Sequence, residues 1–265
     1  MSRIASRFAE LKQAGRSALI PFVTAGDPNP QVTVPLMHAM VAAGADLIEL
    51  GVPFSDPMAD GPTIQAAFQR ALAHPFSIKS VLGLVRNIRT YSQVPVILFG
   101  YYNPFLQYGL EALCKDAREA GADGFLVVDM PPEEAGPMQQ AAGQYGLDLI
   151  FLLAPTSTEE RIRQVCKAGS GFVYFVSVTG VTGARDSLDD TLSGYIDKIR
   201  QHTDLPLGIG FGISRPEQVS EVAGYADAVI VGSAIIKVIE ASAGEPDMLS
   251  RVGEFVKSLK NATRI

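Results

Sequence analysis

Residues 43–51, Ala-Gly-Ala-Asp-Leu-Ile-Glu-Leu-Gly, contain the pattern that indicates how this chain folds. A glycine suited to end a helix is followed, two residues later, by a short and mostly apolar run. Glycine accepts the left-handed conformation that closes a helix, and alanine allows a tight turn into the next strand. The same Ala-Gly-Ala-Asp sequence recurs at 120–123 and, in looser form, as Gly224-Tyr-Ala-Asp227. The pattern predicts repeated helix-to-strand turns.

Eight short apolar runs occur along the chain, and each is followed by a loop and a helical pattern. They lie at 18–24, 46–51, 94–100, 123–128, 148–153, 171–177, 205–210 and 227–232. Most lack polar alternation, as expected for parallel strands that are covered on both faces. Eight such units in 265 residues, with no linker between them, predict a single-domain (β/α)8 TIM barrel over residues 1–265.

Two segments exceed what a minimal barrel requires. Residues 2–15 have apolar side chains at helical spacing and predict an extra N-terminal helix that closes the bottom of the barrel. The long interval after the second run contains the loop 52–61 and helical patterns near 62–73 and 77–91. We therefore expect inserted helices after strand 2, next to a functional loop.

The composition restricts the classes of function. The chain is 47% hydrophobic and 19% charged, which is typical of a protein with a large core. Its net charge of −6 and scattered basic residues disfavour binding to nucleic acid or an anionic membrane. No run reaches the roughly 18 apolar residues of a membrane span, and the N-terminus lacks the apolar core of a signal peptide. Cys114 and Cys166 have no CxxC neighbour, so we expect reduced core thiols and a cytoplasmic location.

Polar residues just beyond the apolar runs are the candidates for chemistry, because barrel active sites lie at the C-terminal ends of the strands. These residues are Thr24, Asp27, Glu49, Asp56, Asp60, Tyr101, Asn103, Asp129 and the segment 174–182. The histidines and lysines of the chain instead fall in helical patterns or at their ends. A metal site, a histidine-based triad and Schiff-base chemistry are therefore disfavoured. Carboxylates remain for proton transfer.

Glu49 is the best candidate for a general acid and base. It interrupts an apolar strand, where desolvation should raise its pKa towards neutrality. The alternative is a structural glutamate held in a salt bridge inside the barrel. Asp60 precedes Gly-Pro, and its alternative role is to cap the helix that follows. Asp56 is either a solvated turn residue or a contact with a partner, and Asp129 is either a site residue or a residue that fixes a turn.

Glycine-rich segments follow the last three runs. They are Gly180-Val-Thr-Gly183, Gly208-Ile-Gly-Phe-Gly-Ile-Ser214 and Val231-Gly-Ser-Ala-Ile235. Exposed backbone N–H groups, with the Ser233 hydroxyl at a helix start, would form a phosphate site. Tight turns alone explain any one segment but not all three together. The second segment has the wrong spacing for a dinucleotide site.

Aromatic residues at several strand ends suggest that the ligand is flat and aromatic as well as phosphorylated. Phe22, Tyr174 and Phe211 belong to this group. The alternative for some of these rings is that they fill the barrel core, where bulky side chains are packed in layers.

Residues 47–65 resemble the signature of the tryptophan synthase alpha subunit family. Segments 21–28, 101–104, 180–183, 210–214 and 231–234 follow in the family's order, so the resemblance covers nearly the whole chain. It implies a (β/α)8 barrel that cleaves indole-3-glycerol phosphate to indole and glyceraldehyde 3-phosphate. The implied retro-aldol reaction needs no cofactor in this chain.

The resemblance also implies roles for individual residues. Glu49 looks like the group that protonates indole C3 and helps to remove the glycerol hydroxyl proton, and Asp60 looks like the partner of the indole N–H. The residues that correspond to the family's substrate-binding positions are Phe22, Tyr174, Thr182, Gly183, Phe211, Gly212, Gly232 and Ser233. Loops 53–61 and 179–190 would be mobile lids.

The partner implied by the resemblance is a pyridoxal-phosphate-dependent beta subunit that receives indole in an α2β2 complex. Asp56, Tyr101 and Asn103 lie in segments that match the partner face. Val178 stands where some members of the family carry arginine, so a charged lid contact would be missing. The rival hypotheses are a stand-alone lyase and another phosphate-binding-barrel isomerase or epimerase.

Overall fold

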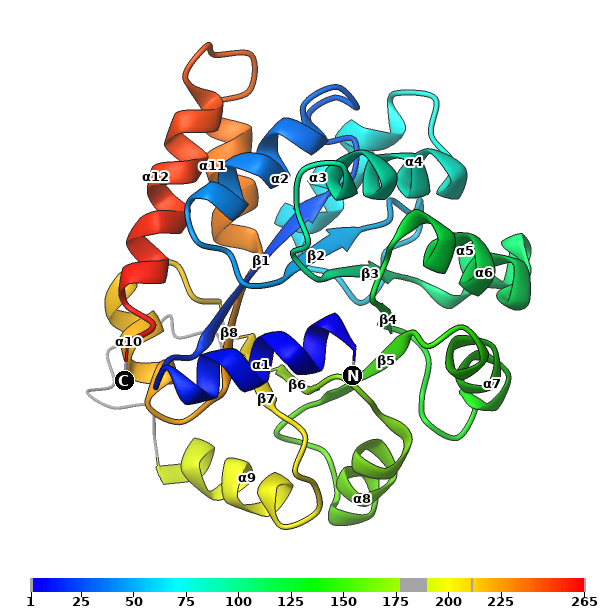
Figure 1. The fold of residues 1–265 in the computed structure, drawn as a ribbon, viewed down its shortest axis with the longest axis vertical. Coiled ribbons are helices and arrows are strands. Elements are labelled where there is room, and N and C mark those ends of the chain that lie inside the picture. The colour runs from blue at the N-terminus through cyan, green and yellow to red at the C-terminus, as the bar shows by residue number, and fades with distance from the viewer. Residues whose placement is uncertain (1, 177–189, 211, 265) are drawn as a thin grey trace.

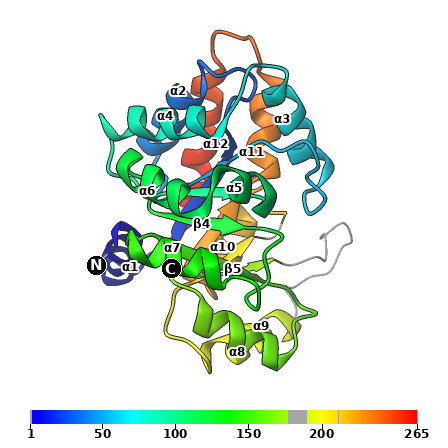
Figure 2. The same cartoon turned by 90° about the vertical axis from the view of Figure 1, so that its right-hand side faces the viewer.

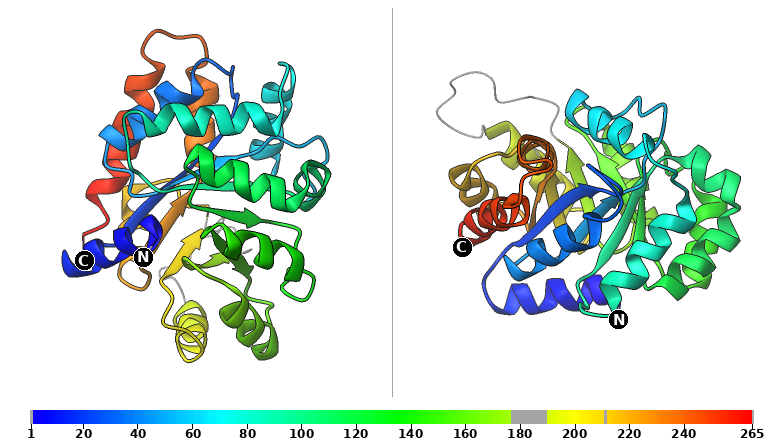
Figure 3. Two further views of the ribbon diagram at one scale, coloured as in Figure 1. Left: turned by 45° about the vertical axis from the view of Figure 1, so that its right-hand side comes forward. Right: turned by 90° about the horizontal axis from the view of Figure 1, so that it is seen from above.

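The computed structural model describes residues 2–176, 190–210 and 212–264, and its eight parallel strands close one barrel in chain order (Figures 1 and 3). The predicted barrel is therefore confirmed. Each predicted apolar run contains the strand that forms. The strands are β1 (Ala18–Thr24), β2 (Ile48–Gly51), β3 (Val96–Gly100), β4 (Gly124–Val127), β5 (Asp148–Leu153), β6 (Val173–Val176), β7 (Leu207–Gly210) and β8 (Ala228–Val231).

Helices surround the barrel, and several strands are followed by two of them. The inserted helices expected after strand 2 are present, and α3 packs beside α11 (Figure 2). Paired helices also follow β3 and β8, which the sequence analysis did not predict. The helices are α1 (Arg3–Gln13), α2 (Thr33–Ala42), α3 (Pro62–Leu72), α4 (Ile78–Arg89), α5 (Tyr102–Tyr108), α6 (Leu110–Ala120), α7 (Gly136–Gln144), α8 (Glu159–Ala168), α9 (Asp190–Arg200), α10 (Pro216–Ala223), α11 (Ser233–Ala241) and α12 (Met248–Asn261).

Helix α1 closes the bottom of the barrel, as predicted (Figure 1). The Ser2 hydroxyl accepts a hydrogen bond from the Ala5 N–H and begins the helix. Ile4, Phe8 and Leu11 are spaced to lie on one face, and that face is buried against the inward side chains of the strands. The helix thereby seals one end of the barrel, so only the opposite end is available for a ligand.

The aspartate of each Ala-Gly-Ala-Asp turn has a structural role that the sequence analysis did not assign. The Asp46 carboxylate accepts the Leu19 N–H at 2.7 Å, and the Asp123 carboxylate accepts the Val96 N–H at 2.8 Å. In the looser turn, Asp227 accepts the Leu207 N–H at 2.9 Å. Each carboxylate thus satisfies a backbone donor of the preceding strand.

Basic side chains neutralise these buried aspartates. Asp46 pairs with Arg7 of α1 and Lys260 of α12, which ties the first and last helices to the barrel. Asp123 pairs with Arg3 at 2.6 Å and with Arg89 at 2.7 Å. A buried charge is tolerated where it is paired and hydrogen-bonded in this way.

The glycines of the three turns do not behave alike. Gly44 (φ +101°) and Gly121 (φ +93°) have the positive φ that the pattern predicted. Gly224 has φ −70°, so the prediction was wrong for the looser copy. There the chain turns without a left-handed residue.

Cys114 and Cys166 are both buried and free, as predicted. In the described parts of the chain, no helix combines the length and the apolar character needed to cross a membrane.

We expect Asp123→Ala to lower the free energy of unfolding by about 3 kcal/mol or more, as measured by urea denaturation. The substitution leaves two arginines without their carboxylate and the Val96 N–H without its acceptor. The matched control is Asp247→Ala, because the Asp247–Arg251 pair is half exposed and should contribute less than about 1 kcal/mol. Equal effects of the two substitutions would contradict a structural role for Asp123.

Candidate active site

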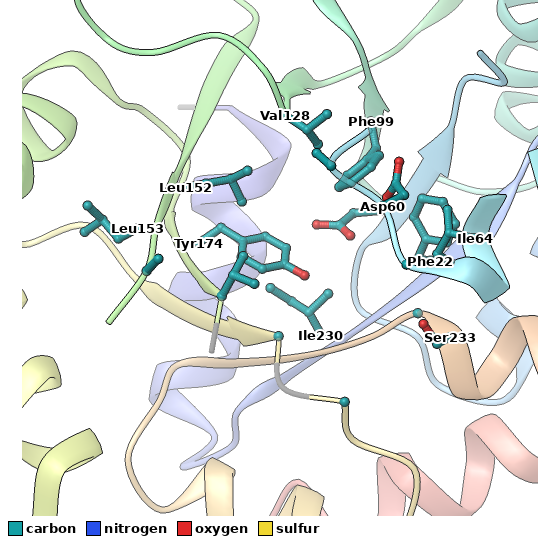
Figure 4. A pocket seen from close by; sticks show the side chains of 18 of the residues that line it. Phe22, Asp60, Ile64, Phe99, Val128, Leu152, Leu153, Tyr174, Ile230 and Ser233 are labelled. Atoms are coloured by element: carbon teal, nitrogen blue, oxygen red, sulfur yellow. The ribbon is translucent and has the colours of Figure 1, made fainter. Parts of the chain in front are cut away.

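A cleft of about 1040 Å³ opens at the C-terminal ends of the strands, opposite α1. All eight strands contribute residues to its lining. Figure 4 shows the side chains of Phe22, Phe99, Tyr174 and Asp60 around one cavity, with Ser233 on the rim. The cleft lies where barrel enzymes have their active sites.

Glu49 lies in β2, at the inner end of the cleft. It is in register with Phe22 of β1 and Ile97 of β3, and only 1% of its surface is exposed. Its Oε1 atom has no hydrogen-bond partner, and among the described residues no Lys, Arg or His forms an ion pair with it. Desolvation by burial raises the pKa of Glu49 to about 8. The alternative of a salt-bridged structural glutamate is therefore wrong within the described part of the chain.

Asp60 lies on the loop after β2 and is held by Tyr101. The Tyr101 hydroxyl donates a 2.6 Å hydrogen bond to Asp60 Oδ2 and accepts one from the Ala59 N–H at 3.1 Å. Burial raises the pKa of Asp60, and the hydrogen bond from Tyr101 opposes that shift. The carboxylate is thus fixed in the cleft by a neutral donor.

The helix-cap alternative for Asp60 is wrong. Helix α3 begins after Gly61, and no side chain caps it. The backbone oxygen of Asp60 instead accepts a 2.8 Å hydrogen bond from Gln65 Nε2, which ties the loop to the first turn of α3. Asp60 therefore keeps its carboxylate available to the cleft.

The three predicted partner contacts have different environments. Asp56 and Asn103 are exposed, and the Asp56 carboxylate accepts a hydrogen bond from the Ser55 hydroxyl. Tyr101 is only 3% exposed, and its ring lies 5.2 Å from that of Phe54. Its side chain is committed to the loop and to Asp60, a role that its position in the sequence did not indicate.

The other polar candidates support the structure around the cleft. Asp129 lines the cleft and accepts the Tyr102 N–H at 2.7 Å, so it holds the start of α5, a contact that its own sequence neighbours did not indicate. Asp27 forms a bidentate ion pair with Arg70, at 2.6 and 2.9 Å, and is absent from the cleft lining. Thr24 is fully buried and also lies outside the lining.

Two glycines permit the aromatic rings to enter the cleft. A Cβ atom on Gly51 would lie 2.5 Å from the Phe22 ring, and one on Gly210 would lie 2.2 Å from the Tyr174 hydroxyl. The sequence analysis assigned Gly210 to a phosphate motif, but this glycine makes room for Tyr174. Nothing in the sequence identifies which ring faces which glycine.

The rings form an apolar slot beside the two carboxyl groups. Phe22 and Phe99 meet edge to face, with their ring centroids 5.1 Å apart. The Tyr174 hydroxyl points into the cavity (Figure 4), and burial together with the nearby Glu49 and Asp60 raises its pKa well above the usual value. Tyr174 therefore remains a neutral hydroxyl.

The start of α11 forms the opposite rim of the cleft. Gly232 is the N-cap and Ser233 the first helical residue, and both line the cleft. The first turn has no side-chain cap and no acidic residue, so its N–H groups are suited to an anion. Gly212, with φ +58°, lines the cleft nearby. Phe211, Val178, Thr182 and Gly183 lie outside the described residues.

The described residues contain no cluster of three or more His, Cys, Asp or Glu side chains that is placed to hold a metal ion. The lysines lie on the surrounding helices, although Lys237 of α11 reaches the cleft lining. The sequence analysis did not distinguish this lysine from the others.

Comparison with known sequences gives one family. The family model described as "Tryptophan synthase alpha chain" matches residues 8–264. A tryptophan synthase alpha chain from Geotalea uraniireducens (strain Rf4) is 54% identical over 260 residues, which cover 98% of this chain and 97% of that protein. One from Thioalkalivibrio sulfidiphilus (strain HL-EbGR7) is 54% identical over 264 residues, which cover 99% of each.

Solved structures are similar over the same length. The crystal structure of tryptophan synthase subunit alpha from Legionella pneumophila str. Paris has a TM-score of 0.92 and 42% identity, and the match covers 99% of this chain and 98% of that one. An open form of tryptophan synthase from M. tuberculosis has a TM-score of 0.90 and 33% identity, and the match covers 100% of both chains.

The burial of Glu49 predicts a specific dependence of stability on pH. The raised pKa means that the folded protein retains a proton which the unfolded chain loses above its ordinary pKa of 4.5. The contribution of protonated Glu49 to the free energy of unfolding is therefore fully present below pH 4.5 and is lost progressively as pH rises to about 8. The slope reaches about 1.4 kcal/mol per pH unit.

Glu49→Gln cannot ionise, so it should lack this contribution. We expect its free energy of unfolding to rise relative to the wild type between about pH 5 and pH 8, as measured by urea denaturation. Glu111→Gln, at an exposed site on α6, is the control and should follow the wild type at every pH. Parallel curves for Glu49→Gln and the wild type would show that the pKa of Glu49 is ordinary.

Proposed function

Because the chain belongs to the tryptophan synthase alpha chain family, a family of lyases, we propose that its cleft cleaves indole-3-glycerol phosphate to indole and glyceraldehyde 3-phosphate. The observation that carries the proposal is a buried glutamate with a pKa of about 8 at the inner end of the cleft, which forms no ion pair with the described residues. Such a group gives and takes protons near neutral pH. The family match supports this lyase rather than an isomerase on a similar barrel.

Glu49 supplies the proton chemistry in this proposal. In its protonated form it donates a proton to indole C3, which interrupts the aromaticity of the pyrrole ring. The resulting carboxylate then helps to remove the proton from the glycerol hydroxyl next to the bond that breaks. The C–C bond electrons return to the ring as the hydroxyl carbon becomes an aldehyde. A pKa of about 8 suits both steps because neither protonation state is strongly favoured.

Asp60 stabilises the charge that develops on the ring. Protonation at C3 places positive charge near N1, so a carboxylate that accepts the N1–H hydrogen bond lowers the energy of the intermediate. Tyr101 holds Asp60 by its 2.6 Å hydrogen bond before the substrate arrives. This preorganisation avoids a rearrangement during the reaction.

The remaining lining would hold the two ends of the substrate. Phe22, Phe99 and Tyr174 form an apolar slot that suits an indole ring. The start of α11, with Gly232 and Ser233, suits the phosphate. The substrate-binding roles of Gly212, Thr182, Gly183 and Phe211 remain proposals taken from the family resemblance.

The family implies a beta subunit as the partner of this chain. We propose that this subunit carries pyridoxal phosphate, receives the indole in an α2β2 complex and works with this chain in the cytoplasm. Asp56, on the loop after β2, and Asn103 of α5 are exposed, and Met58 of the Asp56 loop is 91% exposed. Methionine is enriched at protein–protein interfaces, which supports this face as the partner surface.

Glu49→Gln should lower kcat for indole release by about 10²-fold or more, because general acid–base catalysis contributes that much. Asp60→Asn should also lower kcat, because it removes the negative charge next to N1. Indole release would be measured with the purified chain, alone and with its beta subunit. Glu111→Gln should keep wild-type activity. A wild-type chain that releases no indole in either condition would overturn the proposed function.

Tyr101→Phe tests the positioning of Asp60. It keeps the ring next to Phe54 but removes the donor to Asp60 and the acceptor of the Ala59 N–H. We expect kcat to fall by about tenfold because Asp60 is no longer held in place before the substrate binds. The melting temperature should fall by only several degrees, since a hydrogen bond to a charged group contributes about 1.5–3 kcal/mol to stability. Tyr225→Phe, at a half-exposed site away from the cleft, is the control. Unchanged kcat in Tyr101→Phe would show that Tyr101 does not position Asp60 for the reaction.

A further inference from the structure

Lys237 of α11 lines the cleft together with Ser233 and Ala234 at the start of the same helix. Residues four apart lie on the same face of a helix, so Lys237 is stacked below Ser233. Side chains on a helix lean towards its N-terminus, and the long stem of Lys237 therefore extends over the first turn. That direction leads towards the rim, where the first-turn N–H groups of α11 have no side-chain cap.

Within the described lining of the cleft, Lys237 is the basic residue without an ion-pair partner. Among the described lining residues, the basic side chains are Arg161 and Lys237. Arg161 is paired with Glu133 at 2.6 Å. The lining also contains the carboxyl groups of Asp60 and Asp129, and the chain has a net charge of −6. An anionic ligand would therefore meet an unfavourable field unless a cation were placed near its negative end.

A lysine on a helix surface is often paired with an acidic residue three or four positions away. Glu240 has that spacing from Lys237, but it pairs with Arg70 of α3 at 2.7 Å. In the part of the chain that the structure describes, Lys237 has no ion-pair partner. The neighbouring acid is thus engaged elsewhere, and the ammonium group is available to a ligand.

We propose that Lys237 pairs with the phosphate dianion of the substrate and so selects a phosphorylated ligand. This charged contact would add to the hydrogen bonds from the neutral N–H groups of α11. The proposal rests on the proposed function for the identity of the ligand. The phosphate takes no part in bond cleavage, so the contact is the same in the ground state and the transition state. An interaction of that kind lowers KM and leaves kcat unaltered.

Lys237→Gln removes the charge, Lys237→Arg keeps it, and Lys115→Gln makes the same change in net charge on α6, outside the cleft lining. Binding of glycerol 3-phosphate would be measured by calorimetry, and indole release by steady-state kinetics. For Lys237→Gln we expect about three- to tenfold weaker binding and a similar increase in KM, with kcat within about twofold. Its binding should also depend less on salt concentration, a change that a purely structural role would not produce. Lys237→Arg should stay close to the wild type.

Three results with the variants would overturn the role of Lys237. They are binding by Lys237→Gln that equals that of Lys115→Gln, an unchanged salt dependence, and a loss of kcat with unchanged KM. Absence of indole release by the wild type would overturn the proposed function alone, because the titration with glycerol 3-phosphate tests Lys237 without turnover. A wild-type chain that does not bind glycerol 3-phosphate would overturn the role of Lys237 directly.

Discussion

The burial of the Glu49 carboxyl group, without a compensating charge from the described residues, is the constraint on which the chemistry of this protein depends. Taking a carboxylate out of water is unfavourable, and the usual response is to keep the proton. Glu49 does so because β1 and β3 flank it and the strands cannot move apart without opening the barrel. The fold thereby converts an ordinary glutamate into a group with a pKa of about 8.

Carboxyl groups have different environments at the two ends of the barrel. At the bottom, Asp46 and Asp123 are buried but satisfied by cations and backbone N–H groups, so they bind the first and last helices to the strands. At the top, Glu49 has no such partner within the described segments, and Asp60 accepts a hydrogen bond from the neutral Tyr101 hydroxyl. Paired carboxylates stabilise the fold, whereas the unpaired one is free to exchange a proton. This division matches the separation of stability and catalysis in barrel enzymes.

Much of the fold followed from local patterns, and the contacts of the site did not. The apolar runs predicted the eight strands and the raised pKa of Glu49 within one of them, and helical spacing predicted the closing helix. Each of these signals lies within a few adjacent residues. The bond from Tyr101 to Asp60, the space that Gly210 leaves for Tyr174 and the pairing of Asp123 with Arg3 join residues far apart in the chain. The spacing of apolar residues along the sequence does not predict such long-range contacts. The sequence around Asp60 also suggests a helix cap, because its neighbours indicate the turn but not the direction of its side chain.

The most direct test is a titration of Glu49 itself by ¹³C NMR in protein with labelled glutamate side chains, with Glu49→Gln used to assign the resonance. The account predicts a midpoint of about pH 8 for this resonance. A midpoint near the ordinary value of 4.5 would contradict it, because a fully ionised Glu49 at neutral pH could not protonate the indole ring.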